Sequence, residues 1–374
     1  MKLAVIRQVY NPFGGAERFV ERAVAAMRDE GLEVGLVARR WAGTEQPGQA
    51  FLRCDPFYIG RLWRDAGFAN AALARARAAG YELVQSHERI PGCDIFRAGD
   101  GVHATWLDLR RRVLKPYAAA AQTLSPWHRY TAGAEARMFG HARLAAVICN
   151  SHMVRDDIAR RFGVADSKLH VIYNGLDLER FSPALRAEHR AGLRAGLNVA
   201  PDEMVYLFVG SGFARKGVPQ ILQAAQTMRV PARFWIVGAD KQLQPMQNEA
   251  RARGLGNRVQ FFGPQKDVRP YLGAADAFVL PSLYDPFPNA ALEALASGLP
   301  AIVSSTCGAA EFIRSGNNGY CCDALDIATL AARLDDLAEP GAAPAMRAAA
   351  RRSVEHLSVQ ALAQQLIALY RKLL

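Results

Sequence analysis

Residues 285–293 read Asp-Pro-Phe-Pro-Asn-Ala-Ala-Leu-Glu, and this stretch decides the fold that we expect for the rest of the chain. The apolar run before it, Ala277–Ser282, has the composition of a buried strand. The run after it, Ala290–Gly298, has helical spacing and is followed closely by Pro300. The sequence therefore predicts a strand, a tight loop with one acid, and a helix that carries a second acid.

The chemistry of this loop suits a nucleotide sugar. The first turn of a helix presents unpaired N–H groups and a positive dipole end, which favour a phosphate. An ionised carboxylate such as Glu293 accepts strong hydrogen bonds from hydroxyl groups. The alternative is an ordinary strand–loop–helix turn in which Asp285 is an incidental surface acid, because two acids at this spacing are common by chance.

An acid, seven residues and a Glu at this place resemble the E-x7-E signature of retaining GT-B glycosyltransferases of family 4. In that family the second acid typically binds the nucleotide ribose, and the first lies against the transferred sugar. The resemblance implies these roles for Glu293 and for Asp285, which is one methylene shorter than the usual Glu. It also implies that the amides of Phe287, Asn289 and Ala290 hold the sugar or the phosphate.

Composition places the chain among globular proteins. Its 374 residues fit two domains, and its hydrophobic content of 51% allows large cores. The six cysteines lack a metal-ligand spacing and no Asp-x-Asp triplet occurs, so we expect reduced thiols, no metal and no other cofactor. No apolar run is long enough to span a membrane. The formal net charge of +11 leaves nucleic acid, anionic membrane and anionic substrates open as partners.

Strand-like and helical segments alternate along the chain, which predicts parallel, doubly wound sheets with ligands beyond the carboxyl ends of the strands. Together with the resemblance, this indicates an α/β protein of the GT-B type, with two Rossmann-like domains facing across a cleft. The expected parts are an acceptor-binding domain at 1–180, a linker at 181–200, a nucleotide-sugar domain at 201–355, and a helix at 356–374 that crosses back to the first domain.

Two glycines, Gly14 and Gly15, are expected at the first strand-to-helix turn, where they would let a ligand approach the main chain. The commoner meaning of such a pair is an ordinary tight turn. In family 4, a Gly-Gly pair at this place approaches the donor diphosphate or the acceptor. Asn174-Gly175 resembles the family segment that ends the first domain.

Arg215 and Lys216 follow a buried strand and are flanked by glycines. Two cations at a strand's carboxyl end would neutralise a diphosphate leaving group, and they look like the family's diphosphate-binding pair. The alternative is a solvated basic loop. The resemblance further implies that the main chain at Phe262 and Gly263 binds the base.

Asp100 lies between two glycines after a short apolar segment, which would leave its carboxylate exposed to a ligand. We expect it to touch the acceptor hydroxyl or the leaving region together with His103. The alternative, equally well supported, is a loop Asp that caps the following helix. The segment 106–143 interleaves arginines with aromatic side chains, which favours an anionic bilayer surface. The alternative is a helix with a solvated basic face. Nucleic acid is not expected, because no binding motif accompanies the charge.

The resemblance covers essentially the whole chain, with lipopolysaccharide-core hexosyltransferases as the nearest likeness. It implies retaining transfer of glucose or N-acetylglucosamine from a UDP-sugar to a lipid-anchored oligosaccharide, at the cytoplasmic face of a bacterial inner membrane. Arg215, Lys216, Asp285 and Asp100 are the expected catalytic residues. The alternatives are a catalytically weak nucleotide-binding, membrane-associated Rossmann protein and a sugar-nucleotide epimerase.

Overall fold

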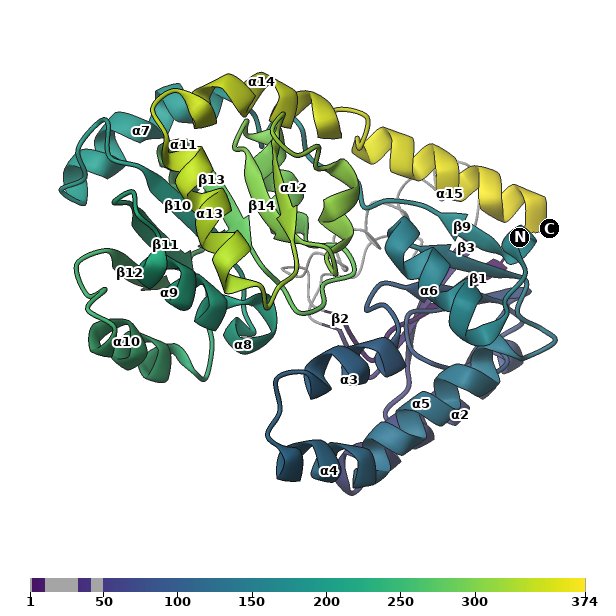
Figure 1. Cartoon of the computed structure of the whole chain (residues 1–374). Helices are drawn as coiled ribbons and strands as arrows, with labels where there is room; N and C mark the ends of the chain where they lie inside the picture. Colours follow the sequence, from purple (N-terminus) through teal and green to yellow (C-terminus); the bar gives the residue numbers. More distant parts are fainter. Residues whose placement is uncertain (1, 11–32, 42–49, 374) are drawn as a thin grey trace. The chain divides into compact units, whose positions relative to one another are not determined.

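The computed structural model describes residues 2–10, 33–41 and 50–373. Contacts divide the chain into two compact units, each of which is described by itself (Figure 1). Unit 1 comprises Met1–Gly175 together with Val359–Leu374, and unit 2 comprises Leu176–Ser358.

Unit 1 is built on a sheet of seven parallel strands in the order β5-β3-β1-β6-β7-β8-β9. Its inner strands are buried along almost their whole length, as expected for a parallel sheet with helices on both faces. The strands are β1 (Lys2–Ile6), β3 (Glu33–Ala38), β5 (Ala50–Arg53), β6 (Leu83–Ser86), β7 (Ile95–Ala98), β8 (Ala146–Cys149) and β9 (Leu169–Val171). A separate short pair joins β2 (Val9–Tyr10) to β4 (Arg40–Trp41).

The helices of unit 1 include the end of the chain, as predicted. The yellow helix α15 in Figure 1 packs Leu362, Leu366 and Tyr370 into one core with Leu3 and Val5 of the first strand. The Tyr370 hydroxyl also donates to the side chain of Gln85. The described helices are α2 (Gly60–Ala78), α3 (His103–Arg111), α4 (Pro116–Leu124), α5 (Pro126–Phe139), α6 (His152–Phe162), the 3-10 turn η1 (Asp166–Lys168) and α15 (Val359–Leu373).

Unit 2 contains a six-stranded parallel sheet in the order β12-β11-β10-β13-β14-β15. The strands from β10 to β12 are added toward one edge of the sheet, and the strands from β13 to β15 are added toward the other edge. Ligands of such sheets bind at the switch point between β10 and β13. Its strands are β10 (Val205–Val209), β11 (Arg233–Val237), β12 (Val259–Gly263), β13 (Ala277–Leu280), β14 (Ala301–Ser304) and β15 (Gly319–Cys322). Its helices are α7 (Ala184–Gly196), α8 (Phe213–Lys216), α9 (Val218–Thr227), α10 (Leu243–Ala252), α11 (Arg269–Ala274), α12 (Asn289–Ala296), the 3-10 helix η2 (Gly308–Phe312), α13 (Ile327–Ala338) and α14 (Ala342–Val354). The predicted doubly wound architecture is confirmed in both units.

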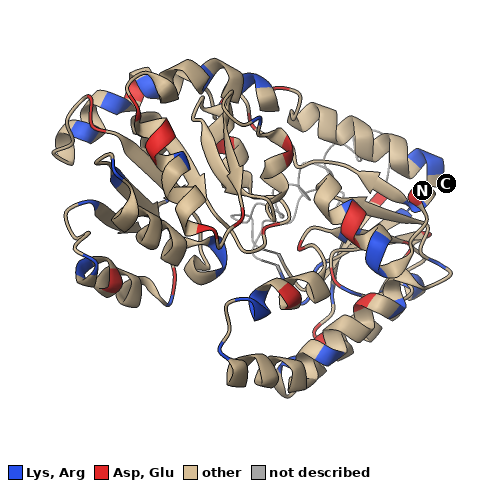
Figure 2. Ribbon diagram, viewed as in Figure 1, with Lys and Arg blue, Asp and Glu red and all other residues tan. Residues whose placement is uncertain are grey.

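The stretch 181–200 is not an extended linker, because most of it forms α7 and packs on α11 within unit 2. Four arginines surround the carboxylate of Asp276, which is 6% exposed. They are Arg186, Arg190, Arg194 and Arg347, with N···O distances of 3.5, 2.8, 3.0 and 3.2 Å. Figure 2 shows basic residues spaced along α7 and α14, which supply them. We refer to these five residues as the Asp276 cluster. Its arginines attach α7 to the sheet.

Candidate functional site

The loop after β10 is shaped by glycines that bring its cations against β13. Its single helical turn, α8, is anchored by the fully buried Phe213. Gly217 follows with φ +89°, and a Cβ there would lie 2.2 Å from the carbonyl oxygen of Pro281. Only glycine allows both this backbone conformation and this close approach. Lys216, the residue before it, is thereby held at the carboxyl end of the neighbouring strand.

Arg215, Lys216 and Asp285 meet at the switch point of unit 2. Lys216 Nζ lies 3.1 Å from Asp285 Oδ2, and an Arg215 guanidinium nitrogen lies 3.7 Å from the same oxygen. Arg215 also donates to the Tyr284 carbonyl at 2.8 Å. The Asp285 main chain is fixed by Thr306 on the adjacent loop, whose carbonyl accepts its N–H at 3.1 Å. The structure therefore brings these three predicted residues together, two cations around one acid.

The Asp285 carboxylate keeps hydrogen-bonding capacity at this place. Its Oδ2 atom is buried and accepts no well-directed hydrogen bond from any group in the described part of the chain. A buried polar atom normally has such a partner. The ammonium group of Lys216, 3.1 Å away, forms an ion pair with this oxygen.

Helix α12 begins directly after this acid, at Asn289. Its N-cap residue is Pro288, whose side chain caps no amide of the first turn. Ala290 lies in that first turn, and Glu293 lies one turn inside with a partly exposed side chain. The Phe287 ring is buried against Phe312, with centroids 6.2 Å apart. Its side chain is thus part of the interior, and only its main chain is available for the role that we predicted.

Sequence reasoning missed Asp240, which supports the cationic loop. Its Oδ2 atom accepts the N–H groups of Gly212 and Phe213 at 2.7 and 2.8 Å. Partial burial raises the pKa of this carboxyl, but hydrogen bonds from three main-chain N–H groups outweigh that effect and lower the pKa overall. The signal in the sequence was an acid shortly after a buried strand, the same pattern that singled out Asp285.

Phe262 and Gly263 end β12, at the same edge of the sheet but two strands away from β10. The Phe262 ring packs on Tyr271, with centroids 4.9 Å apart, and its carbonyl accepts from the Gln265 side chain at 2.8 Å. The Gly263 carbonyl accepts the N–H of Gly238 at 2.9 Å. Neither residue contacts the Lys216–Asp285 pair, so their base-binding role stays a prediction.

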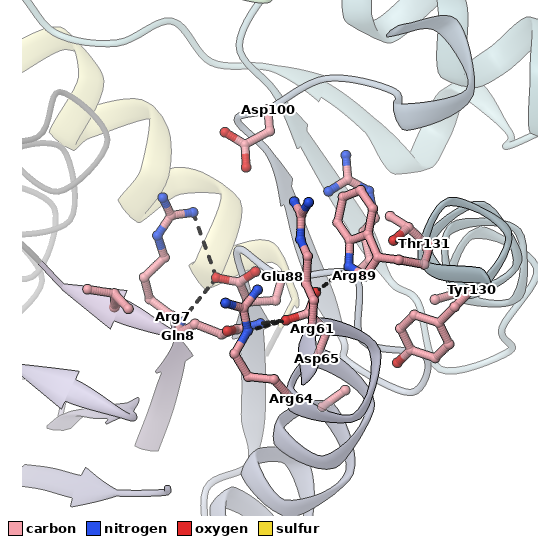
Figure 3. A pocket seen from close by; sticks show the side chains of 14 residues that line it. Arg7, Gln8, Arg61, Arg64, Asp65, Glu88, Arg89, Asp100, Tyr130 and Thr131 are labelled. Atoms are coloured by element: carbon pink, nitrogen blue, oxygen red, sulfur yellow. Dashed lines mark hydrogen bonds and ion pairs between the residues drawn. The ribbon is translucent and has the colours of Figure 1, made fainter. Parts of the chain in front are cut away.

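A cavity of about 340 Å³ lies within unit 1, at the carboxyl edge of its sheet (Figure 3). Its walls come from the ends of β1 and β6, the loop after β7, and helices α2 and α5. Charged side chains dominate the lining. The charged residues are Arg7, Arg61, Arg64, Asp65, Glu88, Arg89 and Asp100.

Asp65 organises one wall of this cavity. Its carboxylate accepts hydrogen bonds from Arg64 at 2.8 Å, Gln8 at 3.1 Å and Trp127 at 2.7 Å. Burial raises the pKa of Asp65, but these three donors outweigh burial and lower the pKa overall. Trp127 is therefore fixed to the cavity wall, although the sequence suggested only a place on a membrane-facing segment.

Asp100 lines the cavity, whereas His103 lies behind its wall, where its ring contacts Trp127 with centroids 5.3 Å apart. Asp100 is exposed, and no hydrogen bond or ion pair of its side chain is found among the described residues. The His103 main-chain N–H donates to the buried Glu135 at 2.9 Å, and its Nε2 lies 3.1 Å from Nδ1 of His128. We expected His103 to assist Asp100, and the structure instead gives it a place in the packing of α3 on α5.

The network around His103 predicts acid sensitivity. Burial, followed by the charges of Arg89, His128 and Arg61, lowers the pKa of His103 to about 3. The unfolded chain takes up this proton near pH 6.5 and the folded chain does not, so stability is complete above pH 6.5 and falls from there toward pH 3. We expect the free energy of unfolding, measured in urea at several pH values, to fall over this interval. A His103→Asn variant should show a shallower slope, and an unchanged slope would contradict this assignment.

Gly14 and Gly15 lie outside the described residues. Among the residues that the structure does describe, no group of three or more His, Cys, Asp or Glu side chains is placed to hold a metal ion. Likewise, no helix in the described ranges is long and apolar enough to cross a membrane.

Two family models match the two halves of the chain. "Glycosyltransferase Family 4" matches residues 13–180, and "Glycosyl transferases group 1" matches residues 190–353. The chain belongs to the GT-B glycosyltransferases of family 4. Its cationic loop, Asp285 and α12 all lie in the half that the group 1 model matches. The residues that line the cavity lie within the match of the family 4 model, except Arg7, Gln8 and Val9, which precede it.

Curated relatives of this glycosyltransferase include enzymes with several different names. An uncharacterised glycosyltransferase of Methanocaldococcus jannaschii, MJ1607, is 31% identical over 46% of this chain and 45% of its own length, so the match spans about half of each protein. An alpha-maltose-1-phosphate synthase of Mycobacterium tuberculosis is 29% identical over 100% of this chain and 99% of its own. The lipopolysaccharide glucosyltransferase WaaG of Escherichia coli is 23% identical, with 83% and 82% coverage.

Solved structures share the GT-B fold over the whole chain. The crystal structure of WaaG, described as a glycosyltransferase involved in lipopolysaccharide biosynthesis, has a TM-score of 0.79 at 20% identity and covers 98% of each chain. The structure of Anabaena Alr3699/HepE in complex with UDP-glucose has a TM-score of 0.72 at 21% identity and covers 100% of each chain. At these sequence identities, the similarity to the solved structures shows a shared fold.

Proposed function

We propose that this glycosyltransferase transfers a hexose, glucose or N-acetylglucosamine, from a UDP-sugar to a lipopolysaccharide-core or related glycolipid acceptor, with retention of anomeric configuration. The observation that carries the proposal is the group of Arg215, Lys216 and Asp285 at the switch point of unit 2, directly before α12. The name of WaaG and the UDP-glucose bound to HepE support the acceptor class and the donor class.

The cations of this group suit the chemistry of the leaving group. When the bond between the sugar C1 and the diphosphate oxygen breaks, negative charge develops on UDP, and Arg215 and Lys216 are placed to stabilise it. The acceptor oxygen forms its bond to C1 on the same face. Its proton passes to the departing phosphate oxygen, so no side-chain base is needed.

The acids bind rather than transfer protons. The Asp285 carboxylate is assigned to accept a hydrogen bond from a hydroxyl group of the transferred sugar, and the partly exposed Glu293 is assigned to the ribose hydroxyls. The first turn of α12 would hold a phosphate or sugar oxygen through the amides near Ala290. No metal ion enters this mechanism.

A transfer assay with analysis of the product tests this function. The full-length protein is mixed with UDP-glucose or UDP-N-acetylglucosamine and a core oligosaccharide, and the new linkage is identified by NMR spectroscopy. We expect an α-linked product, because the donor is an α-glycoside and its configuration is retained. A β-linked product would contradict retention. Donor binding without turnover on any acceptor would favour the alternative of a catalytically weak nucleotide-binding protein.

Contact with an anionic membrane is part of the same proposal. Every large apolar side chain that is exposed in the described ranges belongs to unit 1. Most of them fall in two segments, residues 57–63 and 113–124. The first contains Phe57 and Ile59, which are 75% and 69% exposed, and the second contains Tyr117 and Leu124, which are 72% and 71% exposed. Exposed apolar groups beside arginines suit an anionic lipid surface.

Vesicle binding provides a direct check on this surface. We expect the Phe57→Ser, Trp63→Ser double variant to bind phosphatidylglycerol vesicles at least about fivefold more weakly than the parent in a sedimentation assay, since two exposed aromatic groups no longer enter the interface. The parent should bind phosphatidylcholine vesicles weakly and should lose affinity for phosphatidylglycerol at high salt. Equal binding by the parent and the variant would rule out the 57–63 segment as a contact.

A further inference from the structure

One arginine of the unit 1 cavity has no acidic partner in the part of the chain that the structure describes. Three of the cavity's four arginines face acids: Arg7 lies 3.9 Å from Glu88, Arg64 bonds to Asp65 at 2.8 Å, and Arg89 bonds to Glu135 at 2.9 Å. Among the described residues, Arg61 has no ion pair. It stands on the first turn of α2, at the edge of the cavity.

Arg61 is held by an aromatic ring instead of by an acid. Its guanidinium carbon lies 3.3 Å from the centroid of the Trp127 ring, and the indole N–H of Trp127 is fixed by Asp65 at 2.7 Å. Stacking on an aromatic face orients a guanidinium group while its N–H donors at the edge stay available. Such an arrangement prepares Arg61 to bind an oxyanion with two parallel hydrogen bonds.

The surroundings of Arg61 are electropositive. Helix α5 begins at Pro126, so its positive dipole end lies at Trp127. The pKa of the neighbouring His128 is lowered, first by burial and then by the charges of Arg110 and Arg61. Figure 3 shows the guanidinium groups of Arg7 and Arg61 extending toward the side of the cavity on which Asp100 lies. Two guanidinium groups and one carboxylate therefore lie on that side of the cavity.

We propose that the cavity binds an acceptor sugar that carries an anionic group, a phosphate or a carboxylate, and that Arg61 selects for this group. The inference rests on the proposed function, because it assumes that unit 1 receives the acceptor. The oxyanion lies on the edge of the Arg61 guanidinium, within reach of Arg7. A sugar hydroxyl donates to the carboxylate of Asp100, which has no other partner among the described residues. The cavity volume of about 340 Å³ accommodates one such sugar.

Calorimetric titration with four small probes tests the proposal on the full-length protein. The probes are glucose, glucose 6-phosphate, glucuronate and inorganic phosphate. We expect at least one of the two anionic sugars to bind about tenfold more tightly than glucose. Tighter binding of glucose 6-phosphate would indicate a phosphate on the acceptor, and tighter binding of glucuronate would indicate a carboxylate. Equal binding of glucose and both anionic sugars, or no binding of any probe, would overturn the proposal. Inorganic phosphate binding as tightly as the anionic sugars would also overturn it, because the site would then recognise a free anion.

Matched variants assign the preference to Arg61. The Arg61→Gln change should abolish the discrimination between glucose and the anionic sugars, and Arg61→Lys should restore part of it because the charge is kept. Arg53→Gln removes the same charge from a 74% exposed side chain outside the cavity and should leave the discrimination intact. Full discrimination in the Arg61→Gln variant would contradict the assignment.

The His128 resonance adds a readout that a purely structural role of Arg61 would not move. An anion bound beside Arg61 offsets one of the charges that lower the pKa of His128, so this pKa should rise when the anionic sugar binds and stay constant with glucose. UDP binding is measured on the same samples. UDP binding without discrimination among the sugars would overturn this inference alone, whereas absence of UDP binding would count against the proposed function.

Discussion

Replacing Lys216 with alanine is expected to lower kcat for sugar transfer by about 10²–10³, because the developing charge on the leaving diphosphate loses its most buried cation. The Lys216 side chain is 15% exposed and lies 3.1 Å from Asp285, whereas Arg215 is 35% exposed and lies 3.7 Å away. The effect should fall mainly on kcat, since the charge develops in the transition state. Steady-state kinetics with a UDP-sugar donor provide the measurement.

Two controls separate catalysis from structural damage. The Lys216→Ala change leaves the buried Asp285 carboxylate without its nearest cation, and part of the loss can come from local rearrangement. A Lys216→Ala, Asp285→Asn double variant removes that buried charge. If it recovers the activity, the main role of Lys216 is to neutralise Asp285. Lys372→Ala, an exposed change on α15, should leave kcat unchanged.

The Asp276→Ala variant is expected to show the largest loss of stability, about 3–5 kcal/mol in the free energy of unfolding. It removes the single acid from a cluster of four arginines, and one of these, Arg194, has a side chain that is only 3% exposed. The main-chain N–H of Val205, at the start of β10, also loses its hydrogen bond to this carboxylate at 3.2 Å. Repulsion among the remaining guanidinium groups should release α7 from the sheet.

Hydrogen–deuterium exchange read by mass spectrometry locates this effect. We expect faster exchange in α7, β10 and α11 of the Asp276→Ala variant, with β6 and β7 of unit 1 unchanged. The matched control is Asp336→Ala, which breaks the Arg333–Asp336 pair at 2.6 Å, where both side chains are about 40% exposed. If exchange in that control becomes faster to a similar extent, the loss of protection is not specific to the Asp276 cluster.

The sequence predicted those parts of the fold and site that follow from local patterns. Buried strands followed by helices indicate a parallel sheet, and loops at its carboxyl edge are places for ligands. Arg215, Lys216 and Asp285 were identified because each follows such a strand. Their meeting follows from the position of β10 beside β13, which is the switch point of a doubly wound sheet.

The parts that sequence reasoning missed depend on contacts between distant segments. α7 has few apolar residues, so the stretch was predicted as a linker; its arginines pack because Asp276 lies about eighty positions further along the chain. The cavity of unit 1 joins residues that follow β1 with residues of α2 and α5, and no single stretch shows Asp65 bonded to Trp127. A pattern that is local in sequence cannot report such pairs.

The most direct measurement of the central claim is donor binding and hydrolysis by the full-length protein. UDP-glucose, UDP-N-acetylglucosamine, UDP-galactose and a GDP-sugar are compared by calorimetry and by release of the free nucleotide, with Lys216→Ala beside the parent. The account predicts that a UDP-sugar is bound and turned over in preference to the GDP-sugar, and that turnover collapses in the variant. Binding of none of these nucleotide sugars would contradict it.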